Sequence, residues 1–537
     1  MQTKHKPSVG QQSIYDWVES GSGSGIVNAV AGSGKTYTIV TACDLIDKEK
    51  ECVFLAFNKA IAVELGAKVP SHVEAKTLNS LGHRAWVAHV GRVMLNEKKT
   101  FELCKEHLIG HERRLRADVC KLVGLAKSFG IAPQTDREGV FHGLMGNMYD
   151  DFLQLIEHFD IDVKMTDEPT LIALAQYILK KSADSYRFID YDDQLWMPVI
   201  SNIPVKRYDW VIIDEAQDLS PVQRKLVSMS LKPDGRLLAV GDPHQAIYGF
   251  RGAASDSMER LKSDFKCVEM PLSISYRCAK RIVAKAQEVV PHIEPSPTAP
   301  EGIVDYLTTN DFFYKIGDMV ICRNAAPLVS LAYELLARRV PVLMMGRDIG
   351  EGLIKLIDKL KPKGIDGDNG LRVKLELWSA KEIERAFKKE QDHKVQSIED
   401  KRDSILAFLD GCKATTIPTL KAEIEDLFKP GKVGQRVVLS TIHKAKGLEA
   451  ERVFVYRTDL MPSKYAKLEW MQQQEQNLIY VAYTRAKREL YLVEERANDD
   501  NDTIRETSSK NGARQPPASE LRASATDNGG ADATGSR

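Results

Sequence analysis

The residues best suited to chemistry in this sequence lie in one stretch, residues 26–36, which reads IVNAVAGSGKT. Its apolar start predicts a buried strand, its glycines a loop, and its last residues the first turn of a helix. Gly32 and Gly34 would let backbone N–H groups face inward, where the positive end of the helix favours a phosphate. Lys35 would bring charge to the β- and γ-phosphates of a nucleotide, and Thr36 a hydroxyl for Mg²⁺. The predicted phosphate-binding loop comprises Ala31, Gly32, Ser33, Gly34, Lys35 and Thr36. The alternative is a glycine-rich turn that a lysine follows by chance.

A pair of acids, Asp214 and Glu215, follows the apolar run at residues 210–213. In a phosphate-binding enzyme the first acid can hold Mg²⁺, and the second can orient and deprotonate an attacking water. Acids at a helix N-terminus are also favoured by the helix dipole, which is the alternative without chemistry. Together with the loop upstream, the pair predicts an enzyme that hydrolyses a nucleotide with Mg²⁺.

Several apolar runs, each ending in polar residues, must position these groups. In the first half they lie at residues 26–30, 53–57, 210–213 and 237–240. Such runs predict parallel strands covered on both faces by helices, and ligands bind at the carboxyl edge of such sheets. The second half repeats the pattern at residues 319–322, 342–345, 437–440, 453–456 and 490–493.

Length and composition set the broad class. A chain of 537 residues suggests roughly three or four domains. Its net charge is zero, so a surface for nucleic acid would have to be a local basic groove. The eight cysteines include no CxxC pair, which argues against a zinc or iron–sulfur site and for a reducing cytoplasmic setting. No apolar run approaches the roughly 18 residues of a membrane span, so we expect a soluble intracellular protein without a membrane partner.

The motifs, taken in order, resemble those of the UvrD/Rep/PcrA-type superfamily 1 DNA helicases. The matching segments are AVAGSGKT at 29–36, DEAQD at 214–218, GDPHQAIYGFRGA at 241–253, SYR at 275–277, TIHKAKGLE at 441–449 and YVAYTRA at 480–486. One such motif is a weak signal, whereas the ordered set is highly specific. The resemblance implies an α/β fold with two RecA-like P-loop NTPase domains on parallel sheets, each carrying a helical insertion.

The domain boundaries combine this resemblance with the texture of the chain. Motor domain 1 would comprise 1–84 and 206–275, with a helical insertion at 85–205. Motor domain 2 would comprise 276–347 and 437–495, with a shorter helical insertion at 348–436. Residues 496–537 lose large apolar side chains, and we expect a disordered tail there.

For the nucleotide, the resemblance assigns Gln11 and Tyr276 to the adenine, Tyr276 by stacking, and Glu449 to the ribose. If the register slips, Gln12 takes the place of Gln11. An amide offers both a donor and an acceptor to an adenine edge, although a surface glutamine usually has no such role.

For catalysis, the resemblance makes Gln245 a sensor of the γ-phosphate, which Arg277 and Arg485 would clamp from the second motor domain. The physics agrees, because a transferred phosphoryl group needs cations around its developing charge. An ordinary surface salt bridge is the alternative for each arginine. The complete predicted catalytic set is Lys35, Asp214, Glu215, Gln245, Arg277 and Arg485, with Thr36 and Asp214 as metal ligands.

Contacts with a DNA strand are implied for Asn58, Lys59, Thr77, Asn79, Tyr248, Phe250 and His443. Phe250 stands where the family usually has a tryptophan that stacks on a base, and core packing is its alternative. Asn79 replaces a histidine common in the family. The Thr77 hydroxyl suits a phosphate oxygen but equally suits a helix N-cap.

Two departures from the family pattern and one further feature point toward an F-box DNA helicase-like or compact phage-type branch. They are the short second insertion, Gln476 and Asn477 where longer members often have two arginines, and Tyr191-Asp192-Asp193. The implied function is ATP-dependent movement along single-stranded DNA, 3′ to 5′, with unwinding at single-strand/duplex junctions in replication, recombination or repair. Unidentified replication or repair proteins are candidate partners. Alternatives are a translocase that mainly strips proteins from DNA and a non-catalytic nucleic-acid-binding scaffold.

Overall fold

The structure is a computed structural model. It describes residues 6–56, 58–134, 141–159, 161, 166–247, 256–311, 313–388, 391–412, 414–429, 431 and 434–495. The chain divides into two units, Met1–Glu495 and Arg496–Arg537. All described residues belong to the first unit, and the predicted tail at 496–537 lies outside them.

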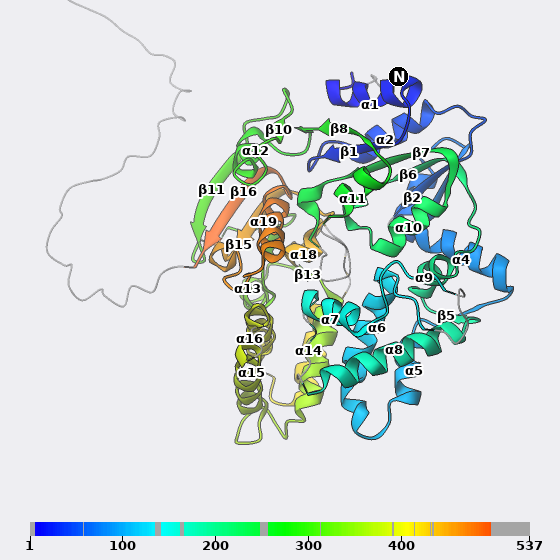
Figure 1. Ribbon diagram of the computed structural model, residues 1–537. Coiled ribbons are helices and arrows are strands. Elements are labelled where there is room, and N and C mark those ends of the chain that lie inside the picture. Colours follow the sequence, from blue (N-terminus) through cyan, green and yellow to red (C-terminus); the bar gives the residue numbers. More distant parts are fainter. Residues whose placement is uncertain are drawn as a thin grey trace, which may run out of the picture. The chain divides into compact units, whose positions relative to one another are not determined.

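The first half of the chain builds a six-stranded sheet in the order β3-β2-β6-β7-β1-β8, in which every pairing is parallel. The strands are β1 (Gly25–Ala29), β2 (Cys52–Ala56), β3 (Val73–Thr77), β6 (Tyr208–Ile213), β7 (Leu231–Gly241) and β8 (Val268–Leu272). The helices beside them include α1 (Val9–Ser20), α2 (Lys35–Asp44), α3 (Lys59–Gly66), α10 (Pro221–Met229) and α11 (Ser257–Asp264) (Figure 1).

Alternation along the central strands explains why helices cover both faces of this sheet. On β2, Val53 and Leu55 pack into one hydrophobic core, while Cys52, Phe54 and Ala56 pack into a second core on the opposite face. Successive side chains of a strand point to opposite faces, so a continuous apolar run needs two cores. This is the arrangement that the apolar runs predicted.

A mostly helical insertion separates β3 from β6. It contains α4 (Leu78–Val90), β4 (Met94–Leu95), α5 (Lys99–His107), α6 (Arg116–Phe129), α7 (Tyr149–His158), α8 (Glu168–Asp184), β5 (Phe188–Ile189) and α9 (Asp193–Ile200). The short strands β4 and β5 pair with each other in parallel. Two residues are too short a run to show a period in the sequence, and these strands were not predicted.

The second half forms another six-stranded parallel sheet, in the order β11-β16-β15-β12-β14-β13. Its strands are β11 (Ile303–Thr308), β12 (Met319–Cys322), β13 (Val342–Met344), β14 (Val437–Thr441), β15 (Ala450–Tyr456) and β16 (Ala486–Glu494). Helices α12 (Lys280–Ala286), α13 (Ala326–Ala337), α18 (Ile442–Ala445) and α19 (Glu469–Tyr483) accompany it. The predicted class, α/β with two RecA-like domains, is confirmed.

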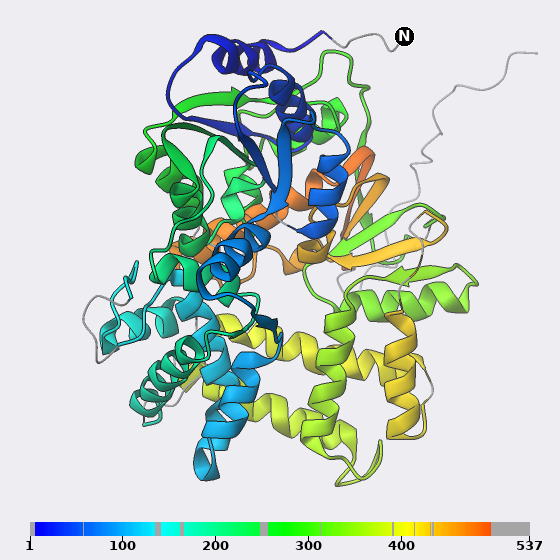
Figure 2. The same ribbon diagram turned by 90° about the vertical axis from the view of Figure 1, so that its right-hand side faces the viewer.

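Over the residues that the structure describes, the second insertion contains helices and no strand, with α14 (Arg347–Leu360), α15 (Leu371–Lys388), α16 (Val395–Gly411) and α17 (Ile417–Leu427) as its long helices. Figure 2 shows the helices of both insertions below the sheets, the first in cyan and the second in yellow. Ile357, Phe408 and Leu420 of the second insertion share one core with Leu439 and Phe454 of the sheet. This insertion is therefore an extension of the second sheet's own core.

Within the two six-stranded sheets, the strands that the sequence did not predict lie at the edges. They are β3, β8 and β11, each with several partly or fully exposed positions. An edge strand is covered less completely than a central one, so its sequence need not be a continuous apolar run.

Within the described part of the chain, no helix is both long and apolar enough to cross a membrane.

Candidate functional site

The predicted phosphate-binding loop connects β1 to α2. Gly32 and Gly34 have φ angles of +73° and +78°, in the left-handed region that favours glycine. A Cβ on Gly32 would also lie only 2.5 Å from the Cβ of Arg277. Gly34 precedes α2 and offers no side-chain cap, so the first N–H groups of that helix remain for an anion.

A cleft of about 480 Å³ opens from this loop, and residues of both halves line it. From the first half come Gly32, Ser33, Gly34, Lys35, Thr36, Tyr37, Asn58, Ile61, Glu215, Asp218 and Gln245, and from the second half Arg277, Lys446, Gly447 and Arg485. We call this space the nucleotide cleft. It brings together most of the predicted catalytic set, although the set is spread over more than 400 residues of sequence.

The two acids lie at the carboxyl end of β6. Asp214 Oδ2 accepts a hydrogen bond from Thr36 Oγ1 at 3.1 Å, so the two predicted metal ligands are adjacent. Burial and the neighbouring Glu215 raise the pKa of Asp214 to about 6. Burial also opposes ionisation of Glu215, but Lys35 and Lys446 outweigh it and hold the pKa of Glu215 below its ordinary value. Glu215 is therefore ionised at neutral pH and able to accept a proton.

The cleft fits a nucleotide phosphate chain and Mg²⁺ on three observations. Thr36 and Asp214 offer the oxygen ligands that Mg²⁺ prefers. Lys35 makes no ion pair with any described residue, and its Nζ contacts only the Ala29 carbonyl, at 3.5 Å. Ser33 Oγ is buried and has no hydrogen-bond partner among the described residues. A phosphate would satisfy both groups.

The two predicted arginines approach from the second half. Arg277 Nε lies 2.6 Å from Glu449 Oε2, so the predicted clamp and the predicted ribose contact form an ion pair. Arg485 is only 1% exposed and donates to the carbonyls of Val481 and Leu448. Burial lowers the pKa of Arg485 to about 10, which leaves it charged at neutral pH.

The remaining predicted nucleotide residues border the cleft rather than line it. Gln11 is buried, accepts from the Ser8 N–H and donates to Thr38 Oγ1 at 3.0 Å. Its amide is committed to capping α1 and joining it to α2, so contact with a base would require an exchange of partners. Gln12 is exposed and bonds Asp16. The Tyr276 N–H donates to the Gly32 carbonyl at 2.8 Å, which ties it to the phosphate loop.

Residues that the sequence left without a role hold the two halves together here. Lys446 Nζ contacts Asp218 Oδ2 at 2.6 Å and the Gln245 carbonyl at 2.7 Å. Tyr480 OH accepts from the Ala31 N–H at 2.8 Å. Both residues lie inside the recognised motifs, but a motif match assigns no contact to them.

A second cavity, of about 800 Å³, lies in the first half and is called the strand groove. It contains Asn58, Lys59, Thr77 and Asn79, together with Ala62, Val63, Gly66, Ala75, Lys76, Ser80, His83, Arg84, Tyr191 and Gln194. Asn58 lines the nucleotide cleft as well, so the two cavities meet at the start of α3. Thr77 accepts from the Ser80 N–H and caps α4, which is the alternative considered for its hydroxyl.

The other predicted strand contacts lie elsewhere. His443 is part of α18 and does not appear among the described residues that line the groove. Tyr248 and Phe250 fall outside the described residues.

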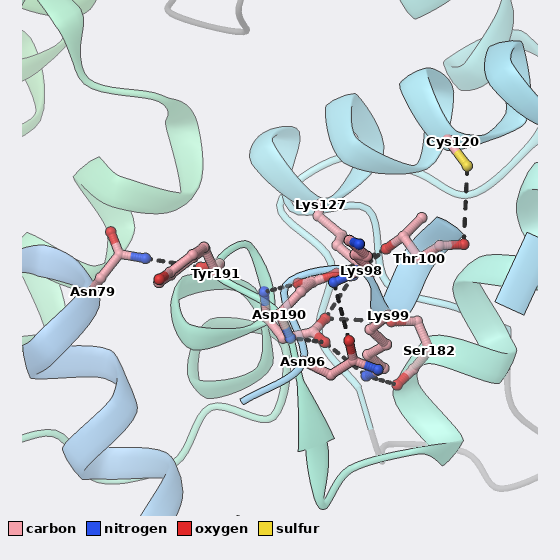
Figure 3. A network of polar contacts seen from close by, with 11 residues as sticks. Asn79, Asn96, Lys98, Lys99, Thr100, Cys120, Lys127, Ser182, Asp190 and Tyr191 are labelled. Atoms are coloured by element: carbon pink, nitrogen blue, oxygen red, sulfur yellow. Dashed lines mark hydrogen bonds and ion pairs between the residues drawn. The ribbon is translucent and has the colours of Figure 1, made fainter. Parts of the chain in front are cut away.

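Asn79 contacts a turn that also carries a charged cluster on its other side (Figure 3). Asn79 Nδ2 donates to the Tyr191 carbonyl at 2.8 Å and to Gln194 Oε1 at 3.1 Å, which joins α4 to the start of α9. The same turn carries Asp190 and Asp193, whose backbone N–H groups each donate to the other's carboxylate.

Two buried lysines neutralise these carboxylates. Lys127 Nζ lies 2.8 Å from Asp190 and 2.8 Å from Asp193, and Lys99 Nζ lies 2.6 Å from Asp193. Burial opposes the ionisation of Asp190, but Lys127 outweighs it and holds the pKa of Asp190 below its ordinary value. We call Asn79, Lys99, Lys127, Asp190 and Asp193 the groove-wall network. It fixes Tyr191 at the edge of the groove.

Comparison with protein families places residues 11–266 in the UvrD/REP helicase N-terminal domain and residues 379–496 in the UvrD-like helicase C-terminal domain. F-box DNA helicase protein 1 of Schizosaccharomyces pombe is 24% identical over 539 residues, which cover 89% of this chain and 55% of that protein. DNA helicase II of Haemophilus influenzae is 24% identical over 301 residues, covering 50% of this chain and 38% of its own. A probable DNA helicase II homolog of Mycoplasma pneumoniae is 33% identical over 105 residues, 19% of this chain and 15% of its own. The chain thus spans about half the length of these curated relatives, or less.

Proposed function

This chain belongs to the UvrD/Rep family of helicases, and on that premise we propose that it is an ATP-dependent DNA helicase or translocase. It couples ATP hydrolysis to movement along single-stranded DNA and to strand separation at a junction. One observation carries the proposal: a single cleft collects a phosphate loop, Glu215 and a glutamine from one half and two arginines from the other, and Asp214 bonds Thr36 at its border.

In this proposal Lys35, Thr36 and Asp214 hold the phosphates and Mg²⁺, with Ala31, Gly32, Ser33 and Gly34 forming the backbone cradle. A bound Mg²⁺ would neutralise phosphate charge during transfer. Glu215 orients the attacking water and takes its proton, and its lowered pKa keeps the carboxylate ionised before that step. Gln11 and Tyr276 hold the base and Glu449 the ribose, which requires the Glu449 pair with Arg277 to rearrange.

Arg277 and Arg485 stabilise the charge that develops on the transferred phosphoryl group. Because both come from the second half and the phosphate loop comes from the first, hydrolysis depends on the spacing between the halves. In this proposal, a change in the spacing between the two halves moves the DNA strand.

The strand groove is the proposed path of the DNA. Lys59, Lys76 and Arg84 supply cations, Asn58 and Thr77 supply polar groups, and Tyr191 supplies an aromatic face. Phe250 and Tyr248 would extend this path, as would His443 from the second half. The polarity, 3′ to 5′, is proposed from the family resemblance alone.

The decisive experiment measures ATP hydrolysis, with and without single-stranded DNA, and strand separation on the same preparations. Wild type should show DNA-stimulated hydrolysis and open a duplex that has a 3′ single-stranded tail. Glu215→Gln should still bind ATP but lose turnover, because an amide cannot accept the proton of the water. An ATP hydrolysis rate that is the same with and without single-stranded DNA would refute the proposal. Removal of a bound protein without opening of a bare duplex would assign the chain to the protein-displacing translocases.

A further inference from the structure

Helix α19 of the second half donates hydrogen bonds to the short segment that carries Gln245. This segment follows β7 and contains the single 3₁₀ turn η3 (Pro243–Gln245). Asn477 on α19 is 4% exposed, and its Nδ2 donates to the Ala246 carbonyl at 3.0 Å and the Pro243 carbonyl at 3.3 Å. Gln473, one turn earlier on α19, donates to Asn477 Oδ1 at 3.1 Å and so orients the amide.

Tyr480, one turn later on α19, connects the same segment to the phosphate loop. Its hydroxyl is buried, accepts from the Ala31 N–H at 2.8 Å and donates to Asp242 Oδ2 at 3.4 Å. Gln245 Nε2 donates to that same Asp242 oxygen at 2.7 Å. The orientation of the Gln245 side chain is thus set by a carboxylate that the second half also holds.

The chain of contacts continues to the proposed catalytic base. The Asp242 N–H donates to Gln217 Oε1 at 3.1 Å, and Gln217 Nε2 donates to Glu215 Oε2. A continuous series of hydrogen bonds therefore runs from Tyr480 through Asp242 and Gln217 to Glu215. Any separation of the halves would strip partners from Asp242 and from two carbonyls of its segment, all of which are buried or half-buried.

We propose that Asn477 and Tyr480 are positioning residues that transmit the spacing of the two halves to Gln245 and Glu215. The proposal rests on the proposed function and deepens it, because it names the side chains through which DNA binding regulates hydrolysis. Neither residue lines the nucleotide cleft, so both act through Asp242 and its neighbours. Asn477 stands where longer members of the family often have arginine, and in this chain its amide donates two hydrogen bonds to the segment that carries Gln245.

The test uses isosteric changes in the full chain. Tyr480→Phe removes one hydroxyl, and Asn477→Asp keeps the size while it removes the donors. Hydrolysis is measured with and without oligo(dT), and strand separation per ATP is measured on the same samples. Tyr483→Phe is the matched control, because it lies on the same helix and its ring contacts Lys285 of the second half.

The expected result is a loss of coupling with the chemistry retained. DNA-stimulated kcat and strand separation per ATP should fall about tenfold in each variant, because Tyr480→Phe loses one hydrogen bond to a carboxylate and Asn477→Asp loses two to neutral carbonyls. The KM for ATP and the DNA-free rate should stay within about twofold of wild type, and Tyr483→Phe should resemble wild type. An unchanged stimulation ratio overturns the proposal, and so does an equal loss of DNA-free hydrolysis.

Two checks keep the outcome clear. Should Asn477→Asp fail to fold, Gln473→Ala replaces it, because it leaves the donors in place but frees the amide to rotate; full stimulation in that variant counts against the proposal. If wild type itself shows no stimulation by oligo(dT), the proposed function fails, whereas a stimulated wild type with unaltered variants refutes only the roles of Asn477 and Tyr480.

Discussion

The nucleotide cleft and the groove-wall network both concentrate lysines and carboxylates, but they pair them differently. In the network, Lys99 and Lys127 are at most 3% exposed and contact Asp190 and Asp193 at 2.6–2.8 Å. In the cleft, Lys35 makes no ion pair with any residue in the described part of the chain. The network completes its own pairing, whereas the cleft leaves charge to be completed by a ligand.

The difference follows from the cost of burying charge. A buried ion without a partner costs several kcal/mol, so a cluster closed to solvent must neutralise itself. A binding site can leave cations and polar groups unpaired where water reaches them, and it gains that energy back when an anion binds. A buried cluster whose charged side chains are all paired therefore indicates a structural role. A cluster with an unpaired cation indicates a binding site.

The largest expected effect is on catalysis, at Arg485. Arg485→Ala should lower the rate of ATP hydrolysis by roughly 10³–10⁵ if it acts as an arginine finger. The phosphate loop should still hold nucleotide, because Lys35 is untouched. The measurement is DNA-stimulated ATPase beside equilibrium nucleotide binding.

Arg485→Lys should rescue this loss poorly. The guanidinium holds two carbonyls through separate nitrogens, and a lysine lacks the planar fork that reaches several oxygens at once. Normal hydrolysis in Arg485→Ala would mean that the second half is not part of the motor.

The same substitution, lysine to methionine, tests the difference between the nucleotide cleft and the groove-wall network. Lys127→Met should lower the free energy of unfolding by about 3–5 kcal/mol, because it leaves Asp190 and Asp193 buried with one lysine fewer. Lys35→Met should change it by less than about 0.5 kcal/mol while it abolishes hydrolysis. Urea unfolding followed by circular dichroism measures both. Similar losses of stability in the two variants would show that the distinction between the regions is wrong.

The sequence predicted the cleft better than the groove wall for a physical reason. A phosphate loop and an acid pair are short continuous motifs, because adjacent backbone atoms do the binding. The groove-wall network draws on separate helices between Lys99 and Asp193, and a buried lysine has the same letter as an exposed one. Tyr191-Asp192-Asp193 was noticed only as a family feature, and its contacts depend on partners nearly 100 residues away.

Contacts between the halves escaped prediction for the same reason. Asn477 was read as a departure from an arginine, yet its amide donates to two carbonyls of the Gln245 segment.

Gln11 matched a position assigned to adenine, but the sequence could not show that Ser8 and Thr38 already engage its amide. Residue types fix which bonds are available, and only the fold decides which partners come within reach.

A smaller effect separates two lysines of the strand groove. Lys59 is exposed and makes no ion pair with a described residue, whereas Lys76 pairs with Glu74 and burial lowers the pKa of Lys76 to about 8. Lys59→Ala should therefore weaken binding of single-stranded DNA up to about tenfold at low salt and reduce the salt slope by about 0.7. Lys76→Ala should change the slope less. Fluorescence anisotropy over a salt series measures both, and equal slopes for the two variants would contradict this assignment of the free cation.

The smallest expected effect is a difference in pH dependence between Asp218 of the cleft and Asp190 of the network. Burial raises the pKa of Asp218 to about 6, although Lys446 opposes the shift. Its native form holds a proton that the unfolded chain has already released between about pH 4 and pH 6, so its contribution to stability falls as pH rises. The pKa of Asp190 is lowered instead, so its contribution is present above about pH 4 and is lost only below that value.

Acidification from pH 7 to pH 5 should therefore add about 1 kcal/mol to the free energy of unfolding through Asp218. Asp214 also has its pKa raised to about 6, so Asp218→Asn should remove only the share of the gain that Asp218 contributes, about 1 kcal/mol. Asp190→Asn should leave the gain unchanged and instead reduce the loss of stability below pH 4. Urea unfolding at each pH provides the measurement. A gain between pH 7 and pH 5 that is as large in Asp218→Asn as in wild type would show that Asp218 does not titrate in this range and that its carboxylate is as fully stabilised as those of the wall.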